Sequence, residues 1–293
     1  MLAACVFAAQ ARAQVPDAPR TASFAEHQRQ CSGKDGWSDP APPVRIFGNV
    51  YDVGSCGIVA LLVVGPKGHV LIDAATAEAV PSIVANIRRL GWRPSDVKLL
   101  LSSHEHVDHA GGFRALQQVT GATLVATAAA RKALESGVPA ADDPQGNGIS
   151  EFAGARVGRI VRDGEIVVLG PLRLTAHTTP GHAPGSTSWT WQSCDRGVCR
   201  AMVYADSLSA ISADGYRFAD HPAYVAAFRA SLAKVARLPC DIVVTPHPAA
   251  SDLYARLSGA KPLVDRNGCA AYAAAAGAKL EKRLADERKL RVR

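Results

Sequence analysis

The segment from His104 to His109 carries four side chains that commonly bind metal ions: His104, His106, Asp108 and His109. The apolar run Val97–Leu101 that precedes it is typical of a buried strand. Residues two apart point the same way in an extended chain, so His104 and His106 can face one ion together. Asp108 and His109 then fall at the start of a predicted helix. An imidazole pair beside a carboxylate–imidazole pair suits two neighbouring cations.

Two further histidines follow predicted strands. His182 lies in a Pro- and Gly-rich turn, residues 179–186, and His247 lies in Thr-Pro-His-Pro, residues 245–248. In open α/β sheets, ligands bind beyond the carboxyl ends of the strands. The flanking Pro and Gly constrain the backbone at these two positions. We therefore predict that both are metal ligands. The other histidines lack such a context and are interpreted as structural or surface residues: His27, His69, His177 and His221.

The pattern of apolar segments predicts an α/β fold. Strands are expected at 44–53, 56–64, 69–73, 97–101, 123–126, 165–169, 172–176, 186–192, 200–205 and 241–245, and helices at 77–90, 128–136 and 223–238. Strand-rich halves that are each followed by helices indicate two β-sheets face to face with helices outside, a four-layer αβ/βα sandwich. Residues 14–44 are interpreted as a loop or arm, and the turn-rich stretch 137–154 as a functional loop.

The first residues and the cysteines indicate export. Residues 1–13 are apolar and end in Ala-Arg-Ala, so we interpret them as the remnant of a signal peptide, with a lipoprotein processing site at Cys5 as the alternative. No later stretch is apolar enough to span a membrane. Six cysteines remain, and sequential pairing is the simplest of several connectivities: Cys31–Cys56, Cys194–Cys199 and Cys240–Cys269. Disulfides imply an oxidising compartment, and we predict the periplasm.

The net charge of +7 does not indicate a nucleic-acid partner. Much of the basic excess lies in residues 279–293, where the charges alternate in sign as on a solvated helix face. A basic patch interleaved with aromatic residues is not evident. The expected partner is instead a small-molecule substrate, and the chain is separately expected to be a monomer.

The motifs together resemble the metallo-β-lactamases, and more narrowly their subclass B3. They are His-x-His-x-Asp-His at 104–109, Thr-Pro-Gly-His-Ala-Pro-Gly-Ser-Thr-Ser-Trp at 179–189, Tyr-Ala-Asp-Ser-Leu-Ser at 204–209 and Thr-Pro-His-Pro at 245–248. The resemblance covers nearly all of residues 14–293, which it implies are one catalytic domain. It implies two zinc ions per chain, the first held by His104, His106 and His182 and the second by Asp108, His109 and His247.

The resemblance also implies an activity and roles for further residues. The expected reaction is hydrolysis of the β-lactam amide of penicillins, cephalosporins and carbapenems by water that the zinc ions activate, which confers antibiotic resistance. Asp108 and Ser207 would act in catalysis, the latter by bonding the water of the second zinc. Ser209 would bind the substrate carboxylate, and Trp37 would border the substrate groove. Cys240 and Cys269 match a family disulfide.

Two other functions remain open from the sequence. A lactonase or thioesterase of the same fold is favoured if Asp206 bridges the two metals, as happens when the 204–209 motif is aligned one residue differently. The other alternative is a zinc-binding protein without activity. Three predicted ligands per ion leave a coordination position for water, which favours a catalytic site. Asp73, at the end of a strand, is expected to orient one ligand histidine from behind, with the capping of a turn as the alternative.

Overall fold

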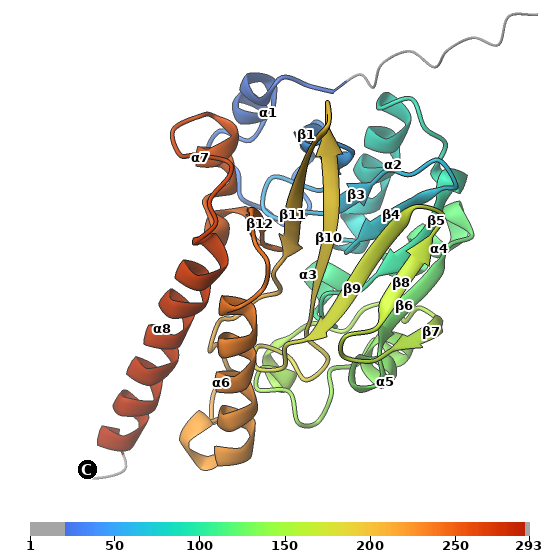
Figure 1. Ribbon diagram of the computed structural model, residues 1–293. Helices are drawn as coiled ribbons and strands as arrows, with labels where there is room; N and C mark the ends of the chain where they lie inside the picture. Colours follow the sequence, from blue (N-terminus) through green and yellow to red (C-terminus); the bar gives the residue numbers. More distant parts are fainter. Residues whose placement is uncertain (1–20, 291–293) are drawn as a thin grey trace, which may run out of the picture.

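Two β-sheets lie face to face in the computed structural model, which describes residues 21–290 (Figure 1). The predicted leader, 1–13, is outside the described residues. The first sheet has the order β1-β2-β3-β4-β5-β6-β7, formed by Val44–Phe47, Val50–Asp52, Leu61–Val63, His69–Ile72, Val97–Leu101, Thr123–Thr127 and Val157–Val161. The second has the order β12-β11-β10-β9-β8, formed by Ile242–Val244, Val198–Tyr204, Thr187–Asp195, Leu172–Thr178 and Ile166–Leu169.

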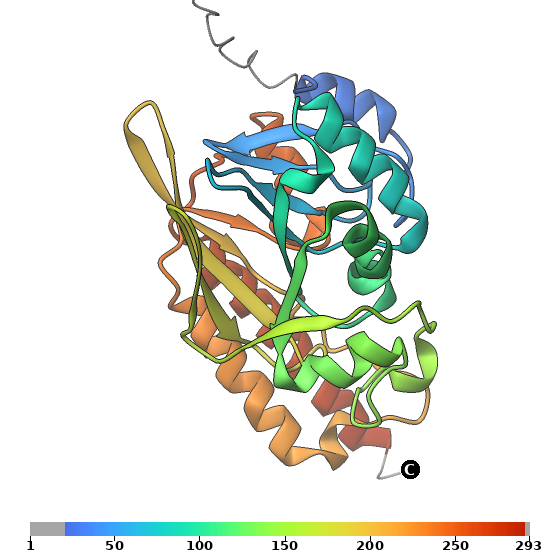
Figure 2. The same cartoon turned by 90° about the vertical axis from the view of Figure 1, so that its right-hand side faces the viewer.

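Helices cover the outer face of each sheet (Figure 2). The first sheet is covered by α2 (Val80–Arg89), α4 (Phe113–Thr120) and α5 (Ala128–Ser136), and the second by α6 (Pro222–Ala236) and α8 (Gly268–Leu290). The shorter helices are α1 (Phe24–Gln30), α3 (Val107–Ala110) and α7 (Leu253–Leu257), with 3₁₀ turns at Ala77–Ala79, Pro94–Asp96, Gly146–Gly148, Phe218–Asp220 and Pro248–Ser251. The predicted four-layer sandwich is thus confirmed.

Alternation along the strands separates the layers. In β4, Val70 and Ile72 join the apolar core between the two sheets, whereas Leu71 packs in the core beneath α2 and α4. Successive side chains of a strand point to opposite faces, so an uninterrupted apolar run fills two cores at once. This is why the buried strands read as continuous apolar segments.

Several predicted boundaries were wrong. The single strand expected at 44–53 is a hairpin, because Gly48 adopts φ +54° and packs against Ser193 and Cys194, where a side chain does not fit. Only Leu61–Val63 of the strand expected at 56–64 joins the sheet. Strand β7 was not predicted, and α1 lies within the segment interpreted as an arm.

Three disulfides join Cys31 to Cys56, Cys194 to Cys199 and Cys240 to Cys269. The second closes the tip of the β10–β11 hairpin, and the third ties the start of α8 to the segment before β12. Within residues 21–290, none of the helices combines the length and the apolar character needed to cross a bilayer.

Asp52 is a buried carboxyl group whose ionisation should limit stability at high pH. Burial raises its pKa to about 7, although the backbone N–H groups of Gly54 and Ala60 oppose the shift. The unfolded chain ionises near pH 4, so between about pH 4 and 7 the unfolded state loses a proton that the folded state keeps. Folding stability therefore falls as pH rises through this window, by on the order of 4 kcal/mol.

We expect Asp52→Asn to remove this penalty. The amide oxygen can still accept from the Gly54 N–H, which lies 2.9 Å from Asp52 Oδ1. In urea unfolding the variant should exceed the wild type by a clearly larger margin at pH 8 than at pH 5, while the exposed control Asp214→Asn should show no such pH-dependent gain. Equal stability differences at both pH values would contradict the assignment.

Candidate metal centre

The site lies where strands of both sheets end at their carboxyl sides. Strand β5 runs into residues 102–109, β9 into the turn that carries His182, and β12 into the turn that carries His247. Strand β4 ends just before Asp73, and β11 ends just before residues 205–209. Segments far apart in sequence therefore meet at one edge of the sandwich.

Hydrogen bonds join the turns that carry the histidines. The Glu105 carboxylate, fully buried between His104 and His106, accepts from the Gly185 N–H at 2.8 Å, and burial raises its pKa to about 7. The Thr187 N–H donates to the Ser103 carbonyl at 2.6 Å. The motif at 104–109 and the turn that carries His182 are thus held as one unit.

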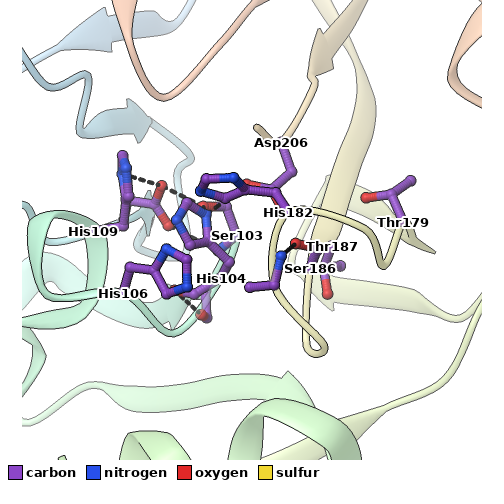
Figure 3. Close-up of polar contacts among 12 residues, drawn as sticks. Ser103, His104, His106, His109, Thr179, His182, Ser186, Thr187 and Asp206 are labelled. Atoms are coloured by element: carbon purple, nitrogen blue, oxygen red, sulfur yellow. Dashed lines mark hydrogen bonds and ion pairs between the residues drawn. The ribbon is translucent and has the colours of Figure 1, made fainter. Parts of the chain in front are cut away.

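The first group of ligand candidates is His104, His106 and His182. One ring nitrogen of each lies within 4.8 Å of those of the others, and all three side chains are buried (Figure 3). Ring centroids are 4.6 Å apart for His104 and His106, and 4.8 Å for His182 with either of them. The structure thus brings together side chains from two distant segments.

Hydrogen bonds leave Nε2 of two of these rings directed at the group. His104 Nδ1 lies 2.8 Å from Asp206 Oδ1, and its Nε2 is buried without a hydrogen-bond partner among the described residues. His182 Nδ1 lies 2.9 Å from Ser209 Oγ and 3.1 Å from its carbonyl oxygen. Burial, followed by the neighbouring histidines, lowers the pKa of both rings well below the usual value. A buried, unpartnered imidazole nitrogen on a neutral ring is the state a metal ligand requires.

The second group is Asp108, His109 and His247. Asp108 Oδ2 lies 3.0 Å from His109 Nε2 and 3.3 Å from His247 Nε2, and the two nitrogens are 3.3 Å apart. Ligand bonds of 2.0–2.1 Å in tetrahedral geometry place neighbouring donor atoms about 3.3 Å apart. The three atoms are therefore spaced as ligands of one small cation. A ring nitrogen of His104 also lies within 4.8 Å of a carboxylate oxygen of Asp108 and a ring nitrogen of His109, so the two groups adjoin.

In the metal-free protein, the charges of Asp108 and His109 compensate each other. Burial disfavours ionised Asp108, but His109 and His247 outweigh it and hold the pKa of that carboxyl well below its usual range. Burial likewise disfavours protonated His109, but Asp108 and Asp73 outweigh it and raise the pKa of the ring to about 10. An imidazolium thus occupies a position that suits a cation.

The donor set has five imidazoles and one carboxylate, a combination that suits Zn(II). Four histidines are interpreted as structural or surface residues: His27, His69, His177 and His221. Among the described residues, none of these four belongs to a group with metal-binding geometry. These residues fit a metal, and the chain carries a histidine-rich metal-binding site.

Asp206 lies behind His104, a candidate ligand. Its Oδ1 contacts His104 Nδ1, and its carbonyl oxygen accepts from the Tyr272 hydroxyl at 3.1 Å. Asp73 has the neighbourhood predicted for it, with Oδ2 at 3.5 Å from His109 Nδ1. Asp206 therefore bonds His104 from the side opposite its Nε2, and the Asp73 carboxylate lies on the corresponding side of His109.

The residues expected to act on substrate line hollows beside the metal centre. Ser207 and Ser209 border a pocket of about 150 Å³ that His247 and Lys279 also line. Trp37 is 47% exposed and borders a cleft of about 660 Å³ that also reaches His247.

Sequence reasoning missed Asp143, Gln145 and Lys279, which lie at or near the two groups of ligand candidates. Asp143-Pro-Gln145 reads as an ordinary turn, and Lys279 as one charge among many on a solvated helix. Only the chain fold shows their position.

The sequence profile of the Metallo-beta-lactamase superfamily matches residues 53–247. The chain therefore belongs to the metallo-β-lactamase superfamily. Solved structures place it within that group: MIM-1 of Novosphingobium pentaromativorans is 53% identical, with 90% of this chain and 98% of that one covered and a TM-score of 0.88. MEM-A1, a subclass B3 metallo-β-lactamase from a soil metagenome library, is 44% identical, covering 87% and 99%, with a TM-score of 0.83. The resemblance to subclass B3 is confirmed.

A hydroxyacylglutathione hydrolase of Brucella anthropi is 28% identical over 173 residues, which are 59% of this chain and 53% of that protein. The chain spans about half the length of this relative.

Proposed function

We propose that the chain is an exported hydrolase that opens the β-lactam amide of penicillins, cephalosporins and carbapenems with two zinc ions. The observation that carries the proposal is the near full-length similarity to MIM-1 and MEM-A1, named as metallo-β-lactamases, together with the two adjoining ligand groups. His104, His106 and His182 would hold the first ion, and Asp108, His109 and His247 the second. Because one chain supplies all six side chains, a monomer suffices.

Zinc supplies a water of lowered pKa and polarises a carbonyl oxygen. The protein's own residues orient the substrate. His182 Nδ1 must carry its proton if Nε2 binds metal, so it donates to Ser209 and leaves the Ser209 hydroxyl hydrogen free. That hydrogen can be donated to the substrate carboxylate, the role expected for Ser209. Ser207 lines the same pocket, and Trp37 would pack against an apolar substituent in the larger cleft.

A thioesterase or lactonase activity is less well supported. The hydroxyacylglutathione hydrolase relative matches over only about half its length. A bridging carboxylate at Asp206 was the feature that favoured this alternative, yet Asp206 Oδ1 bonds the outer nitrogen of His104. The three disulfides are consistent with an oxidising compartment, and we propose the periplasm as the place of action, with residues 14–293 as one catalytic domain.

Chelation should abolish the activity. Purified protein is expected to hydrolyse imipenem and nitrocefin, to lose both activities in EDTA and to regain them on addition of zinc, because water activation depends on the ion. Clavulanate, which acts on serine enzymes, should have no effect. Lactam hydrolysis that persists without metal, or faster hydrolysis of a glutathione thioester than of nitrocefin, would contradict the proposal.

A further inference from the structure

Asp143 connects the turn-rich loop after α5 to the first group of histidines. Its carboxylate is fully buried, and Oδ2 lies 2.8 Å from His106 Nε2. The other oxygen, Oδ1, accepts from the Gln145 N–H at 2.8 Å. Each oxygen therefore has its own partner, one in the metal centre and one in the loop.

The contact determines which nitrogen of His106 faces the centre. A carboxylate accepts hydrogen bonds, so the proton of neutral His106 resides on Nε2 and the Nδ1 lone pair is left for a metal. His104 and His182 have the opposite arrangement, because their Nδ1 atoms are engaged by Asp206 and Ser209. One ring of the first group is thus turned relative to the other two.

The loop that carries Asp143 is tied to a second loop. The Ala213 N–H donates to the Pro144 carbonyl at 2.9 Å, which joins residues 137–154 to 210–221. The Gln145 amide nitrogen lies 3.4 Å from His182 Nδ1 and 3.5 Å from its Nε2. A residue that serves only the turn needs one oxygen, whereas Asp143 also directs its second, buried oxygen at His106.

We propose that Asp143 is a positioning residue of the first metal site, which fixes the His106 tautomer and anchors the loop to that histidine. The proposal rests on the proposed function, since it takes His106 as a zinc ligand. A carboxylate behind a ligand histidine raises its basicity and fixes the ring, and removal of such partners typically lowers metal affinity by about 10–100-fold.

Histidine tautomers in the zinc-loaded wild-type protein give a direct test. Long-range ¹⁵N–¹H correlation spectra should show His106 protonated at Nε2 and bound through Nδ1, with the opposite pattern for His104 and His182. The His106→Gln variant assigns the signals. His106 protonated at Nδ1 would overturn the proposal, and this reading does not depend on whether an Asp143 variant folds.

Asp143→Asn tests the energetic contribution. An amide has one acceptor oxygen, so it can serve His106 Nε2–H or Gln145 N–H but not both. We expect zinc affinity at the first site to fall about 10–100-fold in chelator competition, with the second site unchanged. The neighbouring Asp142→Asn, which alters an exposed carboxylate on the same loop, should leave both affinities at the wild-type value.

The outcomes separate this proposal from the proposed function. Wild-type zinc affinity at the first site of Asp143→Asn overturns the positioning role while leaving β-lactam hydrolysis intact. Wild-type protein that binds zinc with the predicted tautomers yet does not hydrolyse imipenem or nitrocefin overturns the function and leaves Asp143 in its role.

Discussion

The Asp108→Asn variant is expected to bind one equivalent of zinc where the wild type binds two, and to hydrolyse nitrocefin at least about 100-fold more slowly under limiting zinc. Asp108 supplies the only carboxylate among the three converging atoms of its group, with Oδ2 within 3.3 Å of both ring nitrogens. An amide carries no negative charge and directs N–H groups toward the cation in one of its two orientations, so the second ion is held by two neutral imidazoles. Metal analysis after dialysis and turnover at limiting zinc measure the two effects.

The control for Asp108→Asn is a change of equal chemistry elsewhere. Asp142→Asn also replaces a carboxylate by an amide, on an exposed position of the loop near the site, and should keep two zinc ions and the wild-type rate. Added zinc should partly restore Asp108→Asn, because two ligands of the second ion remain. If Asp108→Asn hydrolyses nitrocefin at nearly the wild-type rate under limiting zinc, Asp108 is not a metal ligand, and this result would count against the two-ion proposal.

The site residues that were easiest to predict are those whose metal-binding side chains directly follow a predicted strand. The ligand candidates 104–109 follow a strand directly, so the motif and its position at the sheet edge could be read together. His182 and His247 were identified because each follows a predicted strand within a Pro-constrained turn. The convergence of these three segments depends on pairing between distant strands, and local patterns carry little of that information.

The features that sequence reasoning missed depend on tertiary contacts. Strand β7 contains Gly158 and Arg159, which weaken the alternating pattern, yet pairing with β6 holds it at the sheet edge. The turn at Gly48 is recognised only once Ser193 is known to lie against it. Asp143 and Glu105 have no motif of their own, because a carboxylate that bonds a histidine or an N–H group from another segment can occur in any turn.

The carboxylates behind the histidines explain how the site keeps its geometry. Asp206 holds His104, and Asp73 lies beside His109. Each is fully buried, which is costly unless its oxygens accept hydrogen bonds. Stability of the fold and orientation of the ligands are therefore coupled at these positions, and variants must be chosen to separate them.

Asp73 allows that separation. Its carboxylate accepts from the Ser103 N–H at 2.8 Å, from the Ser103 hydroxyl at 2.6 Å and from the Tyr204 hydroxyl at 2.8 Å, which joins the two sheets. Asp73→Ala leaves these buried donors without their acceptor and places alanine at φ +63°. We expect it to lower the free energy of unfolding by about 3–6 kcal/mol, measured by urea denaturation of metal-free protein. Tyr204→Phe, which removes one of the three donors, should cost about 1–3 kcal/mol.

Asp73→Asn should keep the fold and weaken the metal. Asparagine tolerates a positive φ, and its oxygen can accept from the Ser103 N–H. Its amide N–H can donate to the Tyr204 hydroxyl, which then donates to the Val59 carbonyl at 2.9 Å. The negative charge beside His109 Nδ1 is lost, so zinc affinity at the second site should fall about 10–100-fold while urea denaturation stays near the wild-type curve. Wild-type second-site affinity in this variant would show that Asp73 serves the fold alone, and an unchanged denaturation curve for Asp73→Ala would show that its hydrogen bonds do not stabilise the junction between the sheets.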